Sequence, residues 1–387
     1  MKLDELILEL CPDGVEFVSM NELLKRKQIS TITPTIKVKR NDYLDIGETP
    51  IISQEIEYIS GYCNFHDKNI PCGNYVCFGD HSEHIKYINF SFVQGADGLK
   101  IMRTNESTIS SRYLFHALSS KYQRHNNYER HFKYLTDTII PVPPIEVQRE
   151  IVRILDNFTE LTAELTAELT ARKKQYEFYR DELLTFGNTN VPLLELRSVV
   201  KKSCSGSTPT KGNSEYYING TIPWIRTQDV RFNEITEVDS YITEKAVAET
   251  AAKWIPENCV IVAISGATAG RCAINKIKAT TNQHCLNLEI DETKALYKYV
   301  YYCVYNKYDE LISKKQGARG DLNSSLVLSL KIPVPTLDVQ KRLVNVLDNF
   351  NAICSDLKIG LPAEIEARQK QYEYYRDKLL MFKELGA

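Results

Sequence analysis

Residues 140–158 read IPVPPIEVQREIVRILDNF, and residues 332–350 read IPVPTLDVQKRLVNVLDNF, at a constant offset of 192. A second pair of blocks follows in the same order at an offset of 196, RKKQYEFYRDELLTF at 172–186 and RQKQYEYYRDKLLMF at 368–382. Self-similarity on this scale indicates an internal duplication, and it decides the architecture before any other feature is considered.

The start of the chain repeats a motif from its middle. Residues 4–7 read DELI and precede VEFVSMNELLKR at 15–26, while residues 181–184 read DELL and precede VPLLELRSVVKK at 191–202. The pattern is therefore circular, and it predicts that the end of the second copy lies where the chain begins.

Both copies of the duplicated block have the spacing of a long amphipathic helix. In the first copy, apolar residues from Val147 to Leu169 recur every three or four positions and follow a Pro-Pro pair, as in a heptad seam. In the second copy Gly360 and Pro362 interrupt the seam, which predicts two helices or one sharply kinked helix. Exposed apolar stripes favour antiparallel packing of the two copies; the alternative is that each helix packs on its own globular part.

The segments between the repeated blocks differ in sequence but have similar patterns. Residues 20–139 and 196–331 contain short β-branched and aromatic runs, such as YVCFGDH at 75–81 and VIVAISG at 260–266, which predict strands. Helical stretches follow at 110–122 and 295–312. The expected fold is α+β, with two pseudo-repeated globular α/β domains separated by a pair of long antiparallel coiled-coil helices in a pseudo-twofold circular arrangement. The predicted segments are a first domain at 1–143, a helix at 144–186, a second domain at 187–335, and a helix at 336–387 broken near Gly360–Pro362.

A four-residue unit, TAEL, occurs twice in tandem at 162–169, and we attribute to it the difference between the two offsets. Four residues add about 6 Å to a helix and rotate its face by only about 40°. We hypothesise that the unit is a spacer ruler between the two globular parts; the alternative is a replication slip without consequence.

Composition places the chain among ordinary globular proteins, with 43% hydrophobic and 25% charged residues. A net charge of −2 argues against a free-standing nonspecific nucleic-acid binder but allows local basic surfaces. There is no long apolar run and the first residues are acidic, so we expect a cytoplasmic protein without membrane contact.

The cysteines show no CxxC pair and are interpreted as small buried hydrophobic residues. A cluster of Cys63, His66, Cys72, Cys77, His81 and His84 fits no regular zinc spacing, so we predict no metal site. GATAGR at 266–271 lacks the end of a phosphate-binding loop, and no nucleotide or methyl-donor motif is present. We therefore expect neither catalytic residues nor a cofactor in this chain.

The two variable parts and the phrases IPVP…Q…LDNF and RKKQY..YRD.LL.F resemble the specificity (S) subunit of type I restriction–modification enzymes over essentially the whole chain. GSTPT at 206–210 and GTIPWIRTQDV at 220–230 are also similar to that family. The first part matches less well, through ISTITPTIK at 29–37 and ETPIISQE at 48–55.

The resemblance implies a non-catalytic DNA-specificity subunit. Each variable part would be a target recognition domain reading one half of a bipartite asymmetric double-stranded DNA target. The helices would dock two methyltransferase (M) subunits, and restriction (R) subunits would join through them. S-adenosylmethionine, ATP and Mg would then belong to the partner subunits, with adenine methylation on M and cleavage on R.

Paired hydrogen-bond donors and acceptors read base edges, and cations bind phosphates. The candidate DNA-binding residues are therefore the polar and basic residues of the loops. In the first domain the candidates are Lys37, Lys39, Asp80, His81, Ser82, Arg130, His131 and Lys133, with Arg40, Arg124 and His125 nearby. In the second domain they are Ser207, Thr208, Thr210, Lys211, Arg226, Thr227, Gln228, Asp229, Arg231 and Arg319, with Asn282, Gln283, Lys314 and Lys315 nearby. For each residue the alternative is an ordinary solvated surface side chain.

The repeated helices also carry a common set of aromatic and basic residues. They are interpreted as seam or M-subunit contacts: Tyr176, Tyr179, Arg180, Tyr372, Tyr375 and Arg376. Two rival functions stay open at this stage. One is a scaffold or decoy that binds M subunits without site preference, and the other is a single-chain DNA methyltransferase or nuclease with a cryptic site.

Overall fold

The computed structural model describes residues 2–34, 36–64, 69–95, 98–187, 190–315, 321–355 and 359–386. The chain forms two compact units, unit 1 (Met1–Thr166 with Glu364–Ala387) and unit 2 (Ala167–Ala363). Each unit combines a globular α/β part with portions of both helical copies, so the units divide the chain differently from the four predicted segments.

Unit 1 contains a four-stranded sheet of order β2-β8-β5-β6, a three-stranded sheet of order β4-β3-β7, and the pair β1-β9. Its elements are α1 (Leu3–Leu10), β1 (Glu16–Ser19), α2 (Met20–Lys25), β2 (Ile29–Ile32), β3 (Thr49–Ile52), β4 (Gly61–Cys63), β5 (Tyr75–Gly79), β6 (Ile85–Ile88), β7 (Val93–Gln94), β8 (Leu99–Thr104), α3 (Ser111–Lys121), α4 (Phe132–Asp137) and β9 (Ile139–Val142).

Unit 2 repeats this plan with a five-stranded sheet of order β11-β19-β16-β17-β13, a four-stranded sheet of order β14-β12-β18-β15, and the pair β10-β20. Its elements are β10 (Leu193–Glu195), β11 (Val200–Ser205), β12 (Ile222–Ile225), β13 (Glu234–Ile235), β14 (Tyr241–Ile242), α6 (Glu244–Glu249), β15 (Trp254–Ile255), β16 (Val260–Ala263), β17 (Cys272–Asn275), β18 (Ala279–Thr281), β19 (Cys285–Ile290), α7 (Tyr297–Asn306), α8 (Tyr308–Ser313), α9 (Ser324–Leu328) and β20 (Lys331–Pro333).

The two sheets of unit 1 correspond to those of unit 2, in which β13 and β15 each extend a sheet by one strand. β3 is parallel to β7 and antiparallel to β4, just as β12 is parallel to β18 and antiparallel to β14. β8 lies between β2 and β5, just as β19 lies between β11 and β16. The predicted fold class, two repeated α/β domains with a long helix between them in the sequence, is confirmed.

The first helical copy is α5 (Ile145–Thr185), one continuous helix that includes the TAEL units. The second copy is two helices, α10 (Leu337–Ser355) and α11 (Leu361–Leu379), so the predicted interruption near Gly360 and Pro362 is confirmed. The attribution of the offset difference to TAEL is wrong. The second copy is the longer one, and its additional residues lie where it is interrupted rather than in α5.

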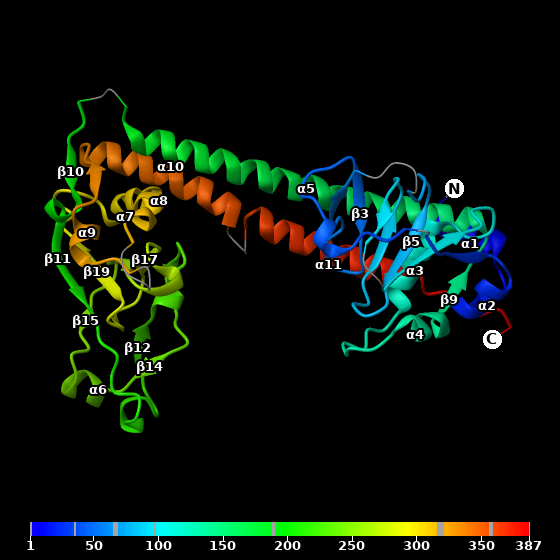
Figure 1. Ribbon diagram of the computed structural model, residues 1–387, viewed down its shortest axis with the longest axis horizontal. Helices are drawn as coiled ribbons and strands as arrows, with labels where there is room; N and C mark the ends of the chain where they lie inside the picture. The colour runs from blue at the N-terminus through cyan, green and yellow to red at the C-terminus, as the bar shows by residue number, and fades with distance from the viewer. Residues whose placement is uncertain are drawn as a thin grey trace. The chain divides into compact units, whose positions relative to one another are not determined.

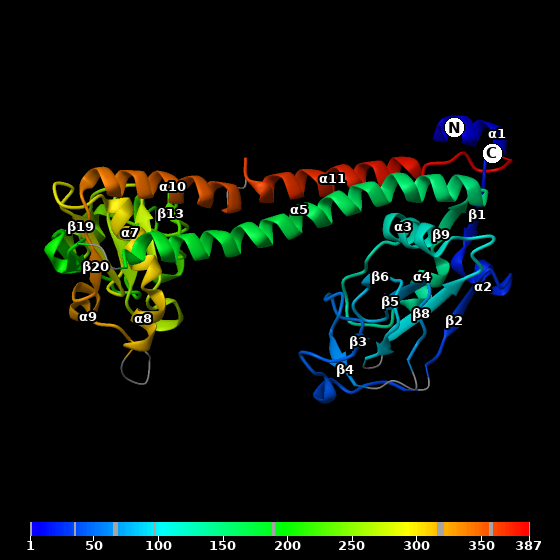
Figure 2. The ribbon, with the colours of Figure 1, turned by 90° about the horizontal axis from the view of Figure 1, so that it is seen from above.

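Within each unit the helices pack antiparallel (Figures 1 and 2). In unit 1 the ring of Phe158 on α5 stacks on Tyr375 of α11, with centroids 5.2 Å apart. In unit 2 the ring of Tyr179 on α5 lies 5.9 Å from Phe350 of α10. The unit boundary between Thr166 and Ala167 falls inside the TAEL repeats.

The predicted circular closure is confirmed at the two chain ends. Val15 forms a bridge with Glu384, its N–H donates to the Lys383 carbonyl at 2.9 Å, and its own carbonyl accepts from the Leu385 N–H at 2.9 Å. The segment that follows α11 is therefore joined to the start of the chain by hydrogen bonds. The equivalent connection in unit 2, from α5 to β10, is made by the covalent chain.

A buried glutamine explains part of the repeated motif. Gln340 on α10 is fully buried, its Oε1 accepts from the Leu296 N–H at 2.9 Å, and its Nε2 donates to the carbonyls of Pro335 at 2.8 Å and Lys294 at 3.3 Å. In unit 1 Gln148 makes the same three kinds of bond, to Ser110, Pro143 and Thr108. The glutamine thus fastens the start of each helix to the globular part.

The aspartate of the LDNF motif has a related role. In unit 1 Asp156 accepts from Arg112 of α3 at 2.7 Å and lies 3.2 Å from His116. In unit 2 Asp348 accepts from Lys298 of α7 at 2.8 Å and from the Tyr302 hydroxyl at 2.6 Å. The motif is the same in both units. Each aspartate accepts from one cation, Arg112 or Lys298, and its second neighbour is a histidine in unit 1 and a tyrosine in unit 2.

We expect Gln340→Ala to lower the free energy of unfolding by about 2–4 kcal/mol, because it leaves buried backbone donor and acceptor groups without partners. Chemical denaturation of the full chain measures this. Gln369→Ala is the matched control, since Gln369 is exposed on α11, and it should change stability by less than about 0.5 kcal/mol. Equal effects of the two substitutions would contradict the role given to Gln340.

The described cysteines are mostly buried, as predicted, and Cys72 is exposed. Cys77 on β5 faces the apolar core. Burial raises its pKa to about 12, which keeps it a neutral thiol. His66 lies outside the described residues. Within the described ranges no helix is long and apolar enough to cross a membrane.

Candidate nucleic-acid interface

In unit 2 the ends of several strands meet at one edge. The Ser207 N–H, after β11, donates to the Thr281 carbonyl at the end of β18, at 2.9 Å. The Asn282 N–H donates to Ile225 at the end of β12 at 3.0 Å, and the Ile264 N–H, after β16, donates to His284 at 2.9 Å. The loops that the sequence indicated separately therefore lie side by side, and they form what we call the unit 2 loop edge: residues 206–211, 226–231, 264–271 and 281–284.

The loop at 206–211 is held closely against β18. A Cβ added to Gly206 would lie 1.8 Å from the Thr281 carbonyl oxygen, so only glycine fits there. The Trp224 indole N–H donates to the Ser207 carbonyl at 3.2 Å, and the Thr208 hydroxyl donates to Gln283. Thr210 and Lys211 are exposed beyond these contacts. The loop is thus fixed at its base and presents its polar end to solvent.

Arg226 lies in the middle of this edge. Its guanidinium carbon lies 5.9 Å from the Trp224 ring centroid, and its buried Nε has no hydrogen-bond partner among the described residues. Its backbone N–H donates to the Asp229 carboxylate at 2.8 Å. Asp229 therefore shapes the turn, which weakens the case for its contacting DNA, whereas Arg226 has unused donor capacity.

The remaining candidates of unit 2 have varied surroundings. Thr227 is half-buried, Gln228 is exposed, and Arg231 is exposed with its Nε donating to the Gln228 carbonyl at 2.5 Å. Lys314 pairs with Glu310 at 2.6 Å. Arg319 lies outside the described residues.

The strand pairing at the corresponding edge of unit 1 shows which of its loops are equivalent to those of the unit 2 loop edge. The Val38 N–H donates to the Gln94 carbonyl at the end of β7 at 3.0 Å, as Ser207 does to Thr281 in unit 2. Ile52 pairs with Gln94 as Ile225 pairs with Thr281, so Ser53 occupies the position of Arg226. Both weakly matching stretches, at 29–37 and 48–55, are thus counterparts of the second unit's motifs. The loop after β3 therefore has a serine where the loop after β12 has an arginine, whereas the loop after β2 carries Lys37 and Lys39.

Some predicted DNA-binding residues of unit 1 are parts of the scaffold. Asp80 is buried, accepts from the Phe132 N–H at 2.8 Å and lies 3.7 Å from the Lys100 ammonium group. His131 is fully buried between the Asp80 carbonyl and the Asn127 side chain. The Ser82 hydroxyl donates to the Gln54 carbonyl. These side chains position loops, and their hydrogen-bonding groups are already in use.

The exposed candidates of unit 1 are cations and one partly exposed histidine. Lys37, Lys39, Arg130 and Lys133 are exposed, and Lys133 pairs with Glu129 at 3.2 Å. The ring of His81 stacks on Tyr128 with centroids 5.2 Å apart. Tyr128 was not among the predicted residues, although it stands between basic residues in the sequence RHNNYER at 124–130.

The predicted helix contacts separate into buried and exposed residues. Tyr176 is buried in the core of unit 2, and Tyr372 is hydrogen-bonded through its hydroxyl to His116 at 2.8 Å. Arg180 and Arg376 are largely covered, each beside the following aspartate. Tyr179 and Tyr375 keep more exposed surface. A partner on these helices could thus touch Tyr179 and Tyr375 far more readily than Tyr176.

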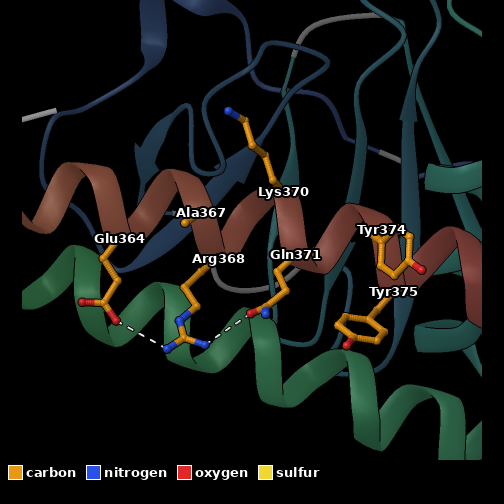
Figure 3. A pocket seen from close by; sticks show the side chains of 7 residues that line it. All are labelled: Glu364, Ala367, Arg368, Lys370, Gln371, Tyr374 and Tyr375. Carbon is orange, nitrogen blue, oxygen red and sulfur yellow. Dashed lines mark hydrogen bonds and ion pairs between the residues drawn. The ribbon is translucent and has the colours of Figure 1, made fainter. Parts of the chain in front are cut away.

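A shallow groove of about 540 Å³ follows the exposed face of α11 (Figure 3). Arg368 bridges its floor, donating to Gln371 at 3.2 Å and to Glu364 at 3.5 Å. Tyr374 and Tyr375 form its other end. The groove is open and mixed in polarity, which suits a protein surface better than an enclosed small molecule.

Comparison with known proteins also finds two copies of one domain in the chain. The family model for the type I restriction modification DNA specificity domain matches residues 12–172 and 190–367. The EcoR124I/EcoR124II specificity subunit of Escherichia coli is 33% identical over 400 residues, covering 97% of this chain and 96% of that protein. A putative specificity subunit of Haemophilus influenzae is 33% identical over 259 residues, covering 63% of each chain.

Two solved structures share the fold. The S subunit of a type I restriction-modification system from M. genitalium aligns with a TM-score of 0.58 at 12% identity, over 95% of this chain and 96% of that one. A chain from work on complex assembly and conformational transition of the type I R-M system aligns with a TM-score of 0.61 at 17% identity, over 95% and 98%.

Proposed function

Since the chain belongs to the family of type I restriction-modification DNA specificity proteins, we propose that it selects a bipartite, asymmetric DNA target, of which each unit reads one half-site. The observation that carries this proposal is that the same edge of converging loops is built twice with different side chains. A repeated scaffold supports two docking sites of one kind, and the different loops support two different base sequences.

The local charge of the loops supports contact with DNA despite the overall charge of −2. Lys211, Arg226 and Arg231 belong to the unit 2 loop edge, while Lys37 and Lys39 follow β2 in unit 1. Cations on loops neutralise phosphates and fix the register, and polar side chains between them read base edges. Acidic residues are plentiful on the helices, as in EVQRE at 146–150, away from these loops in the sequence.

We further propose that M subunits dock on the helices and that R subunits join through them, as the family membership suggests. The exposed tyrosines Tyr179, Tyr374 and Tyr375 support a protein contact there, because exposed aromatic side chains are enriched at interfaces. In this scheme S-adenosylmethionine, ATP and Mg belong to the partners, which methylate adenine and cleave DNA in the cytoplasm. This chain supplies recognition.

Methylated adenines mapped across a genome, with and without the gene, test the proposal. We expect a split motif with a fixed gap that disappears when the gene is removed. Replacing residues 20–139 by the corresponding part of another specificity subunit should change one half of the motif and leave the other half intact.

The same mapping separates the rival functions. A scaffold or decoy would bind M subunits without producing a defined motif. A cryptic methyltransferase or nuclease would act as the isolated chain and bind a methyl donor or a metal ion. Either result would overturn the proposal.

A further inference from the structure

A loop connects α3 and α4 in unit 1 (Figure 1). Tyr128, near its middle, is 90% exposed. A single exposed aromatic side chain is common on protein surfaces, so a role for Tyr128 depends on how its loop holds the ring and on the charges around it. A specific contact through this ring requires a loop rigid enough to hold it in one place.

The base of the loop is anchored by Glu83, a buried carboxylate. It accepts from the Tyr122 hydroxyl at 2.6 Å and from the backbone N–H groups of His125 at 2.8 Å and Asn126 at 2.7 Å. Burial raises the pKa of Glu83, but the bonds from Tyr122, His125 and Asn126 outweigh it and lower the pKa to about 2. The carboxylate is therefore charged at neutral pH, and charged acceptors form the stronger hydrogen bonds.

The far side of the loop is anchored by two histidines. The ring of His131 joins the Asp80 carbonyl at 3.1 Å to the Asn127 side chain at 2.7 Å. His81 Nδ1 lies 2.9 Å from the Glu129 carbonyl, and its ring supports Tyr128 in a near-parallel stack. Contacts on both sides of Tyr128 thus restrict the loop, and the turn at residues 80–82 ties it to the end of β5.

Glu83, His125 and His131 also have side-chain ligand atoms within 4.8 Å of one another, a spacing that could hold a metal ion. The ligand atoms of Glu83 and His131 are already engaged, however. Both ring nitrogens of His131 face oxygen atoms, and both carboxylate oxygens of Glu83 accept hydrogen bonds from donors. The cluster is explained by its role as an anchor of the loop.

The surroundings of Tyr128 indicate what its partner is. Arg124, which lies 3.2 Å from the His84 ring, and Arg130 are exposed on either side of it in the loop. Of the acidic residues nearby, Asp80 and Glu83 are buried, and the partly exposed Glu129 is paired with Lys133 at 3.2 Å. An aromatic ring between two arginines suits a nucleic acid, whose phosphates bind the cations while its bases or sugars pack on the ring. The loop also lies beside the turn that follows β5, at the edge that corresponds to the loop edge of unit 2.

We propose that Tyr128 packs as an aromatic wedge against the bases of the half-site that unit 1 reads, with Arg124 and Arg130 on the flanking phosphates. This inference rests on the proposed function. In unit 1 Ser53 stands at the position of Arg226, and Tyr128 with its two arginines supplies the contact with DNA that this serine cannot make. The unit 2 loop edge carries Arg226 at the position of Ser53, and we assign the wedge to the half-site of unit 1.

The test compares full-length wild type, Tyr128→Ala, Tyr128→Phe and Ile46→Ala, each assembled with its M subunits. Affinity for a target duplex is measured, together with the fluorescence of 2-aminopurine placed in each half-site. Tyr128→Ala should weaken binding roughly 10-fold, since base–aromatic contacts are worth about 1–3 kcal/mol. It should also lower the fluorescence of 2-aminopurine placed in the half-site that unit 1 reads. The fluorescence of 2-aminopurine in the other half-site should not change.

The control variants should behave as wild type. Phenylalanine keeps the ring, and Ile46, 88% exposed, precedes β3 at the end opposite to the loop edge. Unchanged affinity and fluorescence for Tyr128→Ala would overturn the inference while leaving the proposed function intact. Weaker M-subunit binding with unchanged DNA affinity would overturn it in favour of a protein contact. A wild-type complex without site preference would overturn both.

Discussion

Deleting Thr162–Leu165 from α5 should abolish methylation of the native target and create methylation at a target whose gap differs by one or two base pairs. Four residues shorten a helix by about 6 Å and turn its face by about 40°, while one base pair spans about 3.4 Å. The deleted residues lie in unit 1, next to its boundary with unit 2. The deletion therefore leaves the α5–α10 contact of Tyr179 with Phe350 in unit 2 unchanged.

The expected loss at the native target is at least roughly 100-fold, because a displaced unit meets several wrong bases and each costs about 1–3 kcal/mol. Methylated-adenine mapping of the deletion strain measures both the loss and the new gap. The matched control changes Thr162 and Glu164 to alanine, which keeps the helix length and should keep the gap. An unchanged gap after deletion would reject the ruler hypothesis and leave TAEL as a neutral repeat.

Gly206→Ala should remove recognition of the half-site that unit 2 reads. The added Cβ would lie 1.8 Å from the Thr281 carbonyl oxygen and 2.4 Å from its carbonyl carbon, so the loop must move away from β18. That movement displaces Ser207 and Thr208 from Thr281 and Gln283, and with them the polar end of the loop. We expect target affinity to fall roughly 100-fold, because the loss of base contacts is worth about 1–3 kcal/mol each.

The same loop offers a control at Gly212. A Cβ added there meets nothing within 4 Å, so Gly212→Ala should bind DNA as wild type does. Binding to duplexes altered in one half-site at a time measures the effect: Gly206→Ala should lose discrimination in one half and keep it in the other. If both glycine variants bind equally well, the loop at 206–211 does not read the target.

The secondary structure of the repeated blocks was predictable because it depends on local spacing. Heptads from Val147 to Leu169 predict a helix whatever surrounds them, and Gly360 and Pro362 interrupt one for backbone reasons that act within a few residues. The offset difference was assigned to the wrong copy. The TAEL repeat is conspicuous, but the longer sequence lies in the second copy, between Phe350 and Arg368.

The candidate site was predictable only as a set of loops. The sequence indicated 206–211 and 226–231, but their contact with 281–284 depends on the pairing of β12 with β18 and of β11 with β19, which are distant in the chain. Asp80 and His131 carry the chemistry of DNA contacts and are buried instead, because each satisfies backbone groups of a loop that folds over it. Tyr128 was not predicted, because an exposed tyrosine has no sequence signature of its own.

The duplication and the helical copies follow from the sequence alone, which also predicted antiparallel packing of the copies and a circular closure of the chain. These predictions rest on the spacing of apolar residues along each helix and on the repetition of whole blocks. The bridge between Val15 and Glu384 comes from the tertiary structure. Tertiary structure alone decided which polar side chains face solvent at the loop edges, and that Ser53 stands where Arg226 stands in the other unit. Burial and hydrogen-bond partners depend on residues brought together by long-range strand pairing, and no local pattern encodes them.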